Sequence, residues 1–398
     1  MTELHRLALF GGTPLFDHLV RPGQQAMPDW TSYEAIFRDI FDRQYYTNHG
    51  PLVQSLERRL AEYLDVEHVI CMTNEFIALV SVAHALCLGG RIVIPANCPP
   101  ATSRTLDWTA ARPLYCDVDS ETGLLTASLV ERAIADSQVS AVLAVNAWGD
   151  ACAVADLEAL AKRKAISLYF DSAQGLGCCI GDRRLGSFGN AEVISLHSDN
   201  VLSAIEGGVI CTENGDLAAY LRNMRSSYGM GRSVPVPKTT NGRMSEAQAA
   251  LALFGLDHLD QRIAQNERIF RTFQRGIAAI PGLAVRAFHG ITKSNYQNLI
   301  CVIDEQLFGL RRDLLVTVLR SENIAVGVGF CRAPSGPQKD WPDGACDTFP
   351  GARRYSARMI ELPISSKLTE ADAARIVERI AHIQANAQAI GRRLAQPV

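Results

Sequence analysis

Residues 171–208 read DSAQGLGCCIGDRRLGSFGNAEVISLHSDNVLSAIEGG. The acidic residue Asp171 ends one apolar run, AISLYF, and a second apolar run, AEVIS, ends in a polar turn that leads to a Glu-Gly-Gly at 206–208. Short apolar runs of this kind are typical of strands buried in a parallel sheet. Because parallel strands present their carboxyl ends at one edge of a sheet, we expect the polar residues after both runs to lie close together.

The same alternation extends toward the N-terminus. Between residues 68 and 171 the apolar runs HVICMT, RIVIPA, RPLYCDV and VSAVLAV are separated by amphipathic segments, which predicts repeated strand-helix units. We therefore predict an α/β fold with a three-layer large domain, built on a mainly parallel sheet with helices on both faces. The predicted organisation is an N-terminal segment at 1–30, a large domain at 31–245, and a long helix followed by a small α/β domain at 246–398.

Composition and charge exclude several classes of protein. The 398 residues are 47% hydrophobic and 20% charged, the composition of a globular protein with a large core. The net charge is −3 and the basic residues are scattered, so we expect no nucleic-acid partner. No apolar run is long enough for a membrane span or a signal peptide, which favours a cytoplasmic protein.

The 11 cysteines do not predict a metal site or a disulfide framework. Most are single residues within apolar runs, and Cys178 and Cys179 are adjacent to each other rather than spaced as C-x-x-C. Buried free thiols are the expected state of such residues in a reducing compartment. We predict no bound metal.

Four motifs together resemble the DegT/DnrJ/EryC1/StrS family of sugar aminotransferases. They are the DSAQ at 171–174, the SLHSDN at 195–200, the EGG at 206–208 and the TNGRMSE at 240–246. The resemblance covers nearly the whole chain. It implies the fold-type-I architecture, pyridoxal phosphate (PLP) as the family cofactor, small-molecule substrates such as keto-sugars and cyclitol ketones, and a homodimer with its cleft at the subunit interface.

In this alignment of motifs, Asn200 stands where the family has the lysine that binds PLP covalently. A lysine amine also moves the proton between substrate and cofactor, whereas an amide is neither nucleophilic nor basic. Ordinary transamination is therefore not expected of this chain.

The resemblance assigns cofactor-binding roles to several retained residues. Asp171 would hold the pyridine nitrogen, Gln174 would lie beside the 3-hydroxyl, Ser195 would bind the phosphate, and Asn241 would bind it from the neighbouring subunit. A helix cap or loop carboxylate is the alternative for Asp171. Asn74 and Asn200 complete the cofactor-binding set that we predict.

Other positions depart from the family pattern. Glu75 and Phe76 replace a glycine and a threonine in the turn that holds the cofactor phosphate, where a helix N-terminus favours an anion. Pro99 falls where an aromatic residue normally stacks on the pyridine ring, and Asn146 replaces a histidine. Turned inward, the Glu75 carboxylate would repel a phosphate; turned outward, it would cap its own helix.

His197, Asp171 and Cys98 are the candidate catalytic residues. Neutral His197 would serve as a base, as a histidine does in the family's sugar 3-dehydratase branch, although it lies three positions before Asn200; a structural histidine is the alternative. Cys98 would be a nucleophile if His197 reached it, and a buried thiol otherwise. Lys238 would enter the cleft from a partner subunit or remain an exposed loop residue.

Three functional hypotheses follow. The first is a repurposed, PLP-independent enzyme of a specialised biosynthetic pathway, with no covalently bound cofactor. The second is an enzyme that holds PLP or its amine form, PMP, without a covalent bond, as in the dehydratase branch. The third is a non-catalytic homologue that binds a metabolite or serves as a partner subunit.

Overall fold

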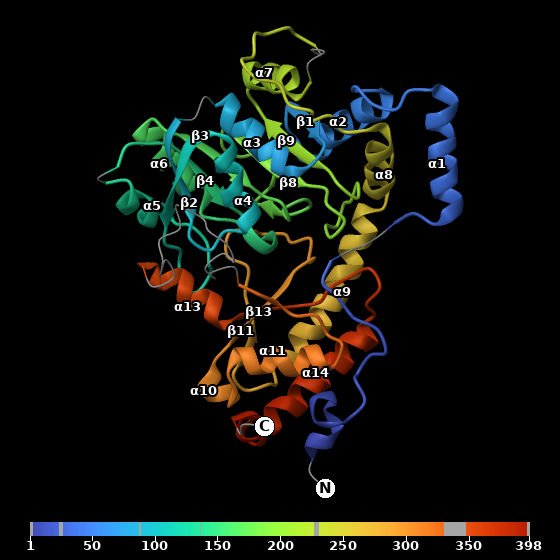
Figure 1. The fold of residues 1–398 in the computed structure, drawn as a ribbon, viewed down its shortest axis with the longest axis vertical. Coiled ribbons are helices and arrows are strands. Elements are labelled where there is room, and N and C mark those ends of the chain that lie inside the picture. The colour runs from blue at the N-terminus through green and yellow to red at the C-terminus, as the bar shows by residue number, and fades with distance from the viewer. Residues whose placement is uncertain are drawn as a thin grey trace.

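The centre of the larger part of the protein is a seven-stranded sheet (Figure 1). Its strands, in spatial order, are β1 (His68–Met72), β9 (Gly208–Thr212), β8 (Ala191–Ser195), β5 (Ser167–Asp171), β4 (Val139–Val145), β2 (Gly89–Pro95) and β3 (Ala110–Cys116). Neighbours from β8 to β3 are parallel, and β9 alone runs antiparallel to both of its neighbours. The predicted mainly parallel sheet is confirmed.

The computed structural model describes residues 3–23, 27–86, 89–135, 137–226, 231–329 and 348–395.

Helices cover both faces of this sheet because its strands are apolar on both sides. In β5, Tyr169 faces a core that includes α3 (Glu75–Ala85) and α7 (Gly215–Arg225), whereas Leu168 and Phe170 face α5 (Ala127–Ala133) and α6 (Val154–Lys164). Helices α2 (Pro51–Leu64) and α8 (Glu246–Asp257) cover the end of the sheet around β8, β9 and β1. This alternation produces the predicted three layers.

The smaller part contains a four-stranded antiparallel sheet. Its order is β10 (Leu283–Val285), β11 (Leu299–Ile303), β13 (Met359–Leu362) and β12 (Gly327–Val328). Helices α9 (Leu259–Ile277), α11 (Arg312–Ser321) and α14 (Glu370–Ala385) pack on it around a separate core. The N-terminal segment joins this core through Leu7, Phe16 and Val20, and buried Glu322 accepts hydrogen bonds from the N–H groups of Ala8 and Leu15.

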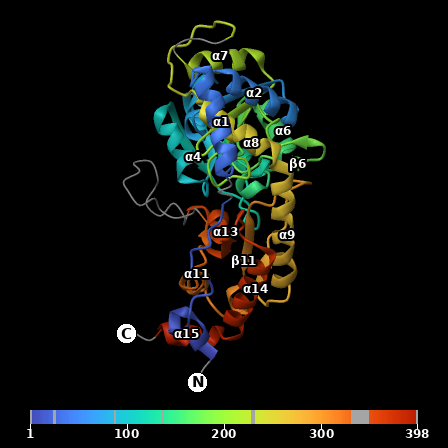
Figure 2. The same cartoon turned by 90° about the vertical axis from the view of Figure 1, so that its right-hand side faces the viewer.

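A break at His258 divides the long helical stretch that the sequence predicts after residue 245. His258 ends α8 and immediately precedes α9, and its ring Nδ1 lies 2.8 Å from the carbonyl oxygen of Phe254. Helix α8 packs against α2 on the large sheet, whereas α9 packs against α14 (Figure 2). The two helices therefore connect the larger part to the smaller one.

The remaining helices are short or lie away from the two sheets. They are α1 (Trp30–Arg43), α4 (Pro100–Arg104), α10 (Glu305–Phe308), α13 (Pro350–Arg358) and α15 (Ala387–Ala395), and a short hairpin pairs β6 (Cys179–Ile180) with β7 (Arg183–Arg184). Helix α1 projects from the side of the larger part (Figure 1). In the part of the chain that the structure describes, none of the helices combines the length and the apolar character needed to cross a bilayer.

Candidate active site

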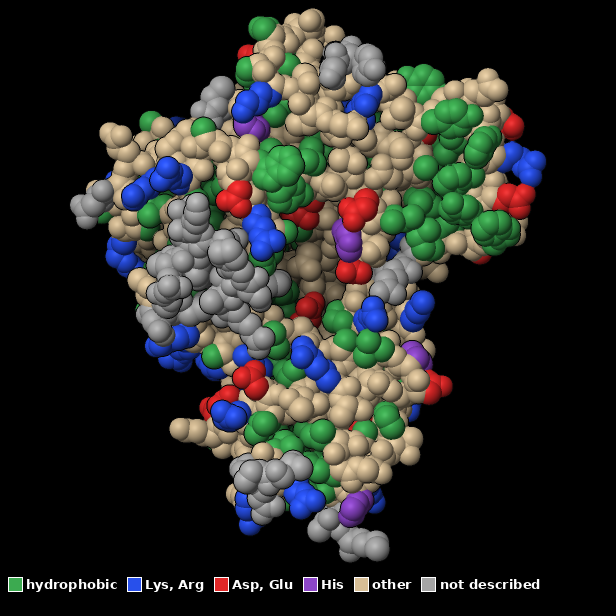
Figure 3. Space-filling model, in the orientation of Figure 1, with side chains coloured by type: hydrophobic (Ala, Val, Ile, Leu, Met, Phe, Trp, Pro, Cys, Tyr) green, Lys and Arg blue, Asp and Glu red, His purple; other side chains and the backbone are tan. Residues whose placement is uncertain are grey.

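A cavity of about 420 Å³ lies at the carboxyl ends of β4, β5 and β8. It is lined by Glu75, Pro99, Ala101, Thr102, Val145, Asn146, Ala147, Trp148, Asp171, Ala173, Gln174, Ser195, His197, Asp199 and Asn200. A smaller cavity of about 210 Å³ adjoins it and adds Glu206 and the N-terminus of α3 to the wall. On the face that contains this hollow, acidic and histidine side chains lie at one edge of its opening, and a basic side chain lies at the other (Figure 3). The site therefore lies where parallel α/β sheets bind their ligands.

Asp171 is the last residue of β5 and its carboxylate points into this cavity. Only 1% of the residue is exposed. The Thr102 hydroxyl donates a hydrogen bond of 2.6 Å to Asp171, and the N–H of Ala173 donates another of 3.1 Å. Burial raises the pKa of Asp171, and the hydrogen bonds from Thr102 and Glu75 act in the opposite direction. Thr102 is a contact that the sequence analysis missed, because a threonine in a short helix carries no motif.

The carboxyl group of Glu75 is turned inward onto Asp171. Glu75 is the first residue of α3, and its side chain hydrogen-bonds with both Asp171 and Ser195. Burial, and then the charge of Asp171, raises the pKa of Glu75 well above its ordinary value. Two carboxyl groups in contact in a buried site disfavour each other's ionisation. Of the two, Glu75 is the one whose pKa the charge of its neighbour raises, and its hydrogen bond lowers the pKa of Asp171.

The Asn200 amide is part of the cavity wall and both of its ends are engaged. Its Nδ2 donates to the Ser195 carbonyl oxygen at 3.1 Å, and its Oδ1 accepts from Gln297 Nε2 at 3.1 Å. Gln297 is also held in place, because its Oε1 accepts from the Val201 N–H at 2.7 Å. Gln297 was not predicted from the sequence, because it precedes β11 of the smaller part and is 97 residues from Asn200 in the chain.

His197 lies at the mouth of the cavity with 47% of its side chain exposed. Its two ring nitrogens are 3.7 Å from carboxylate oxygens of Asp199 and Glu206. The Asp199 N–H donates to His197 Nδ1 at 3.4 Å, and Nε2 is the ring nitrogen on the side of Glu206. The ring can therefore meet a ligand that enters from solvent.

Gln174 and Trp148 form the opposite part of the wall. The Trp148 N–H donates to Gln174 Oε1 at 3.0 Å, and Trp148 is held at a positive φ of 57° in the turn after β4. This backbone conformation is uncommon for a large side chain and requires support from the surroundings.

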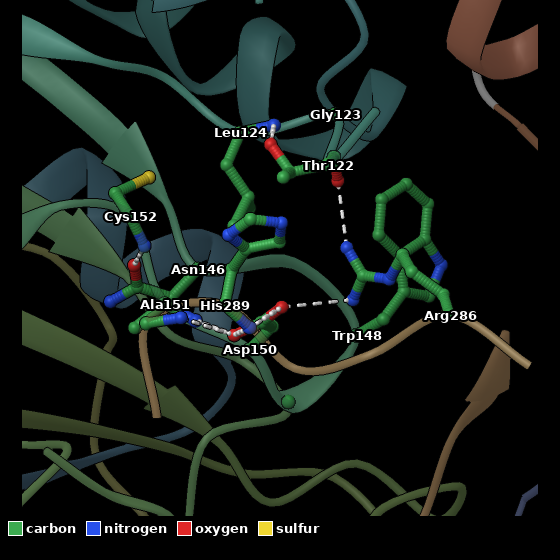
Figure 4. A network of polar contacts seen from close by, with 12 residues as sticks. Thr122, Gly123, Leu124, Asn146, Trp148, Asp150, Ala151, Cys152, Arg286 and His289 are labelled. Carbon is green, nitrogen blue, oxygen red and sulfur yellow. Dashed lines mark hydrogen bonds and ion pairs between the residues drawn. The ribbon is translucent and has the colours of Figure 1, made fainter. Parts of the chain in front are cut away.

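A buried ion pair supplies that support and ties the two parts of the protein together (Figure 4). Asp150 accepts hydrogen bonds from three backbone N–H groups at 2.9 to 3.0 Å, those of Ala151, His289 and Gly290. Arg286, which follows β10, lies 3.3 Å from Asp150, donates to the Thr122 carbonyl oxygen at 2.7 Å, and lies over the Trp148 ring at 5.9 Å.

A second buried acid, Glu192 of β8, lies behind the cavity. The Asn146 amide donates to Ser172 Oγ at 2.9 Å, the Ser172 hydroxyl donates to Glu192, and the Phe188 N–H donates to Glu192 at 3.1 Å. Burial raises the pKa of Glu192 to about 7. Glu192 interrupts the apolar run AEVIS, and that interruption is the signal by which the sequence could have revealed it.

The structure does not bring Cys98 into the cavity wall. Cys98 is 7% exposed and packs in the core beneath α3 and α4, and burial raises the pKa of its thiol to about 12. A thiol in this environment is neutral near pH 7 and is a poor nucleophile. Asn74 caps α3 instead of lining the larger cavity, since its Oδ1 accepts from the Ile77 N–H at 2.9 Å.

Asn241 and Lys238 also lie outside the cavity wall of their own chain. Asn241 is exposed and accepts hydrogen bonds from the Arg243 guanidinium at 2.8 and 3.1 Å. Lys238 is exposed in the preceding segment.

The contacts in the cavity do not match the requirements of PLP. Asp171, which would hold the pyridine nitrogen, already accepts from Thr102 and Glu75. The N-terminus of α3, where a phosphate would bind, carries the inward-turned Glu75 carboxyl. No lysine or arginine lines either cavity within the described part of the chain, so neither a covalent attachment point nor a counter-ion for a phosphate is provided there.

Comparison with known proteins identifies the relatives of this chain. Residues 32–381 match the model of the DegT/DnrJ/EryC1/StrS aminotransferase family. The dTDP-4-amino-4,6-dideoxy-D-glucose transaminase of Shigella dysenteriae is 24% identical over 93% of this chain and 99% of its own length. The GDP-perosamine synthase of Vibrio cholerae is 25% identical over 82% of this chain and 89% of its own.

Solved structures show the same likeness. The crystal structure of DesI in the presence of its TDP-sugar product is 31% identical and superimposes with a TM-score of 0.88, covering 99% of this chain and 100% of DesI. Spr1654 from Streptococcus pneumoniae, solved in a PMP form, has a TM-score of 0.83 at 18% identity and supports the fold alone. These structures confirm the predicted fold-type-I architecture.

Proposed function

This chain belongs to the DegT/DnrJ/EryC1/StrS aminotransferase family, and we propose that it is a repurposed biosynthetic enzyme that uses the family's cavity without covalent PLP chemistry. One observation carries the proposal: the Glu75 carboxyl hydrogen-bonds to Asp171 in a cavity whose described wall contains no lysine. The family relatives named above act on sugars, so we infer a small, hydroxylated substrate for this cavity as well.

The residues of the wall have distinct roles in this proposal. Asp171 is the buried carboxylate that accepts a proton or hydrogen bond from the substrate, and Thr102 orients it through the 2.6 Å hydrogen bond. His197 at the mouth accepts a proton from a substrate hydroxyl or carbon and exchanges it with solvent. The Asn200 amide, fixed by Gln297, orients substrate oxygens by hydrogen bonding.

We also propose that the protein is a homodimer. The exposed aromatic residues of α1 support this proposal. Trp30 is 73% exposed and Phe41 63% exposed, and Tyr33 stacks between Trp30 and Phe37 with ring centroids 5.5 and 4.4 Å apart. Figure 3 shows the resulting hydrophobic patch on the projecting part of this face. An apolar patch of this kind is typical of a subunit interface. Sedimentation velocity of wild type and Phe41→Asp tests it: a wild-type monomer would contradict the proposal.

The function is tested by product formation. Purified protein is incubated with a panel of keto-sugars, cyclitol ketones and amino derivatives, with and without added PLP or PMP, and products are identified by mass spectrometry. We expect turnover without either cofactor, and a loss of about 100-fold or more in kcat/KM for His197→Ala. The matched control, His18→Ala, removes an exposed histidine far from the cavity and should leave turnover unchanged.

Other outcomes have equally definite meanings. Turnover only in the presence of PLP or PMP supports the non-covalent, dehydratase-like alternative. Equal activity of wild type and His197→Ala removes the histidine from the mechanism. Absence of turnover across the panel, together with activation of an active family member on mixing, supports the partner-subunit alternative.

A further inference from the structure

A chain of hydrogen bonds connects a fully buried acid with the wall of the cavity. Glu192 accepts from the Ser172 hydroxyl, and Ser172 Oγ accepts from the Asn146 amide at 2.9 Å. Asn146 lines the cavity, whereas Glu192 and Ser172 are not exposed at all. The three residues come from β8 and from the positions directly after β5 and β4, which are neighbouring strands. A change at Glu192 can therefore reach the cavity through hydrogen bonds.

The cavity end of this chain has a defined direction. Asn146 Oδ1 accepts from the Cys152 N–H at 2.9 Å (Figure 4). A backbone N–H only donates, so a reversed Asn146 amide would place two donors against each other. The amide nitrogen is thus the end that faces Ser172. Ser172 Oγ accepts from Asn146, and its own hydrogen is directed to Glu192.

The contacts at the other end suit an ionised Glu192. One carboxylate oxygen accepts from the Ser172 hydroxyl and the other accepts from the Phe188 N–H at 3.1 Å. A protonated carboxyl group needs an acceptor for its O–H, and the Phe188 N–H cannot supply one. Ser172 Oγ would then accept from both neighbours, and its own hydrogen would lose its acceptor, which is costly in a buried site. Protonation of Glu192 therefore loosens the chain at Ser172 and Asn146.

The surroundings of Glu192 place its ionisation near neutral pH. Burial raises the pKa of Glu192 to about 7, and its hydrogen bonds, including those with Ser172, Phe188 and Asn146, act in the opposite direction. The titratable and charged groups on the elements around it are Cys211 of β9, Asp171 of β5, Glu158 of α6, Tyr63 of α2, and Arg183 and Arg184 of β7. Burial raises the pKa of Cys211 well above its ordinary value, so this thiol stays neutral where Glu192 titrates.

We propose that Glu192 is a positioning residue of the cavity: through Ser172 it holds the Asn146 amide in the wall, and it releases that amide when it takes up a proton. One proton moves in this step, from the buffer to a carboxylate oxygen of Glu192, and the Ser172 O–H bond rotates without breaking. Asn146 is therefore held more firmly above pH 7 than below it. This inference rests on the proposed function, because it concerns the wall of the same cavity.

Two NMR signals of the full-length protein report on the two ends of the chain. The Phe188 backbone N–H contacts Glu192 directly, and the Asn146 side-chain NH₂ lies at the cavity end. Selective ¹⁵N labelling of phenylalanine and asparagine in deuterated protein makes both observable, and Phe188→Leu and Asn146→Gln assign them by their loss. In a pH titration of the wild type we expect both signals to shift in one transition with its midpoint at about pH 7.

Variants identify the residues responsible. Glu192→Gln should lose the transition at both signals. Ser172→Ala should keep the transition at Phe188 and lose most of it at Asn146, because the connecting hydroxyl is gone. The matched control Glu213→Gln, at an exposed position, should keep both transitions.

Three results would overturn the proposal. They are an Asn146 signal that does not shift in the wild type, an Asn146 transition that persists in Glu192→Gln and thus belongs to Asp171, and a full Asn146 transition in Ser172→Ala. Circular dichroism checks the fold of each variant. If Glu192→Gln does not fold, the wild-type titration and Ser172→Ala still decide the question.

The outcomes also separate this inference from the proposed function, because the titration needs no substrate. Coupled transitions without turnover of any compound in the substrate panel would leave the inference standing and remove the enzymatic proposal. Turnover without coupling between Glu192 and Asn146 would do the reverse.

Discussion

The carboxyl group of Glu75, at the start of α3, is hydrogen-bonded to the carboxylate of Asp171, at the end of β5. Each residue occupies a position that resembles part of a cofactor site, the first at the phosphate turn and the second at the pyridine nitrogen. In contact with each other, they fill both positions with protein.

We predict that introducing a lysine at position 200 is not by itself sufficient for PLP binding. Asn200→Lys incubated with PLP and reduced with borohydride should give no pyridoxyl modification at residue 200 by peptide mass spectrometry, because the Glu75 side chain still occupies the phosphate position. The double variant Asn200→Lys/Glu75→Gly should give the modified peptide, at a cost of about 1 kcal/mol in helix stability.

The matched control for this experiment is Asn200→Met/Glu75→Gly, which offers a side chain of similar length without an amine. Pyridoxyl modification at residue 200 in Asn200→Lys alone would contradict the view that Glu75 closes the phosphate position.

The buried Glu192 predicts a specific dependence of stability on pH. Its pKa is about 7 in the folded protein and about 4.5 as a free side chain, so the folded state binds more protons between these values. The free energy of unfolding therefore falls as pH rises from about 4.5 to about 7, by about 3 kcal/mol from this residue.

Glu192→Gln should remove the part of the pH dependence of the unfolding free energy that comes from Glu192. Urea unfolding at several pH values should show that the stability of the variant relative to wild type increases from pH 4 to pH 8. Glu213→Gln, at an exposed position, should follow the wild-type curve. Parallel curves for wild type and Glu192→Gln would show that the pKa of Glu192 is the same in the folded and the unfolded protein.

Cys98 should be inert in the folded protein. With a pKa of about 12, only about one part in ten thousand of its thiol is ionised at pH 8, and the side chain is buried. Iodoacetamide at pH 8, followed by peptide mass spectrometry, should modify the half-buried Cys179 well before Cys98, and unfolding in urea should make the two equal. Labelling of Cys98 at the rate of Cys179 would restore it as a candidate nucleophile.

Loss of the Asp150 carboxylate should strongly destabilise the protein. Asp150→Ala leaves the Arg286 guanidinium buried without its partner and removes the acceptor of three backbone N–H groups. We expect a loss of about 3 to 5 kcal/mol in the free energy of unfolding, measured in urea. Asp107→Ala, at an exposed position, should change it by less than about 0.5 kcal/mol.

Much of the fold could be predicted from sequence patterns because the rules behind them are local. Apolar runs separated by amphipathic segments specify strands and helices, and the resulting sheet is the mainly parallel one that was expected. The break at His258 was missed because the helical periodicity continues through it, and only the packing of α8 and α9 on different cores separates the two helices.

The candidate site was predictable only in part. Asp171, Gln174, Ser195, His197 and Asn200 were found from their motifs, and all five line the same cavity. Thr102, Gln297 and the ion pair of Asp150 with Arg286 were not found, because each makes its contact with a residue distant in the chain.

The sequence by itself determined that this protein has the architecture of its family, and it predicted that Asn200, after β8, stands at the position of the family's lysine. Whether Glu75 caps its helix or enters the cavity was left open by the sequence, since both are compatible with the first turn of α3. Only the tertiary structure decided it. Folding brings the helix start against the end of β5, and in that buried setting a carboxyl group is stable when it keeps its proton and shares it with Asp171.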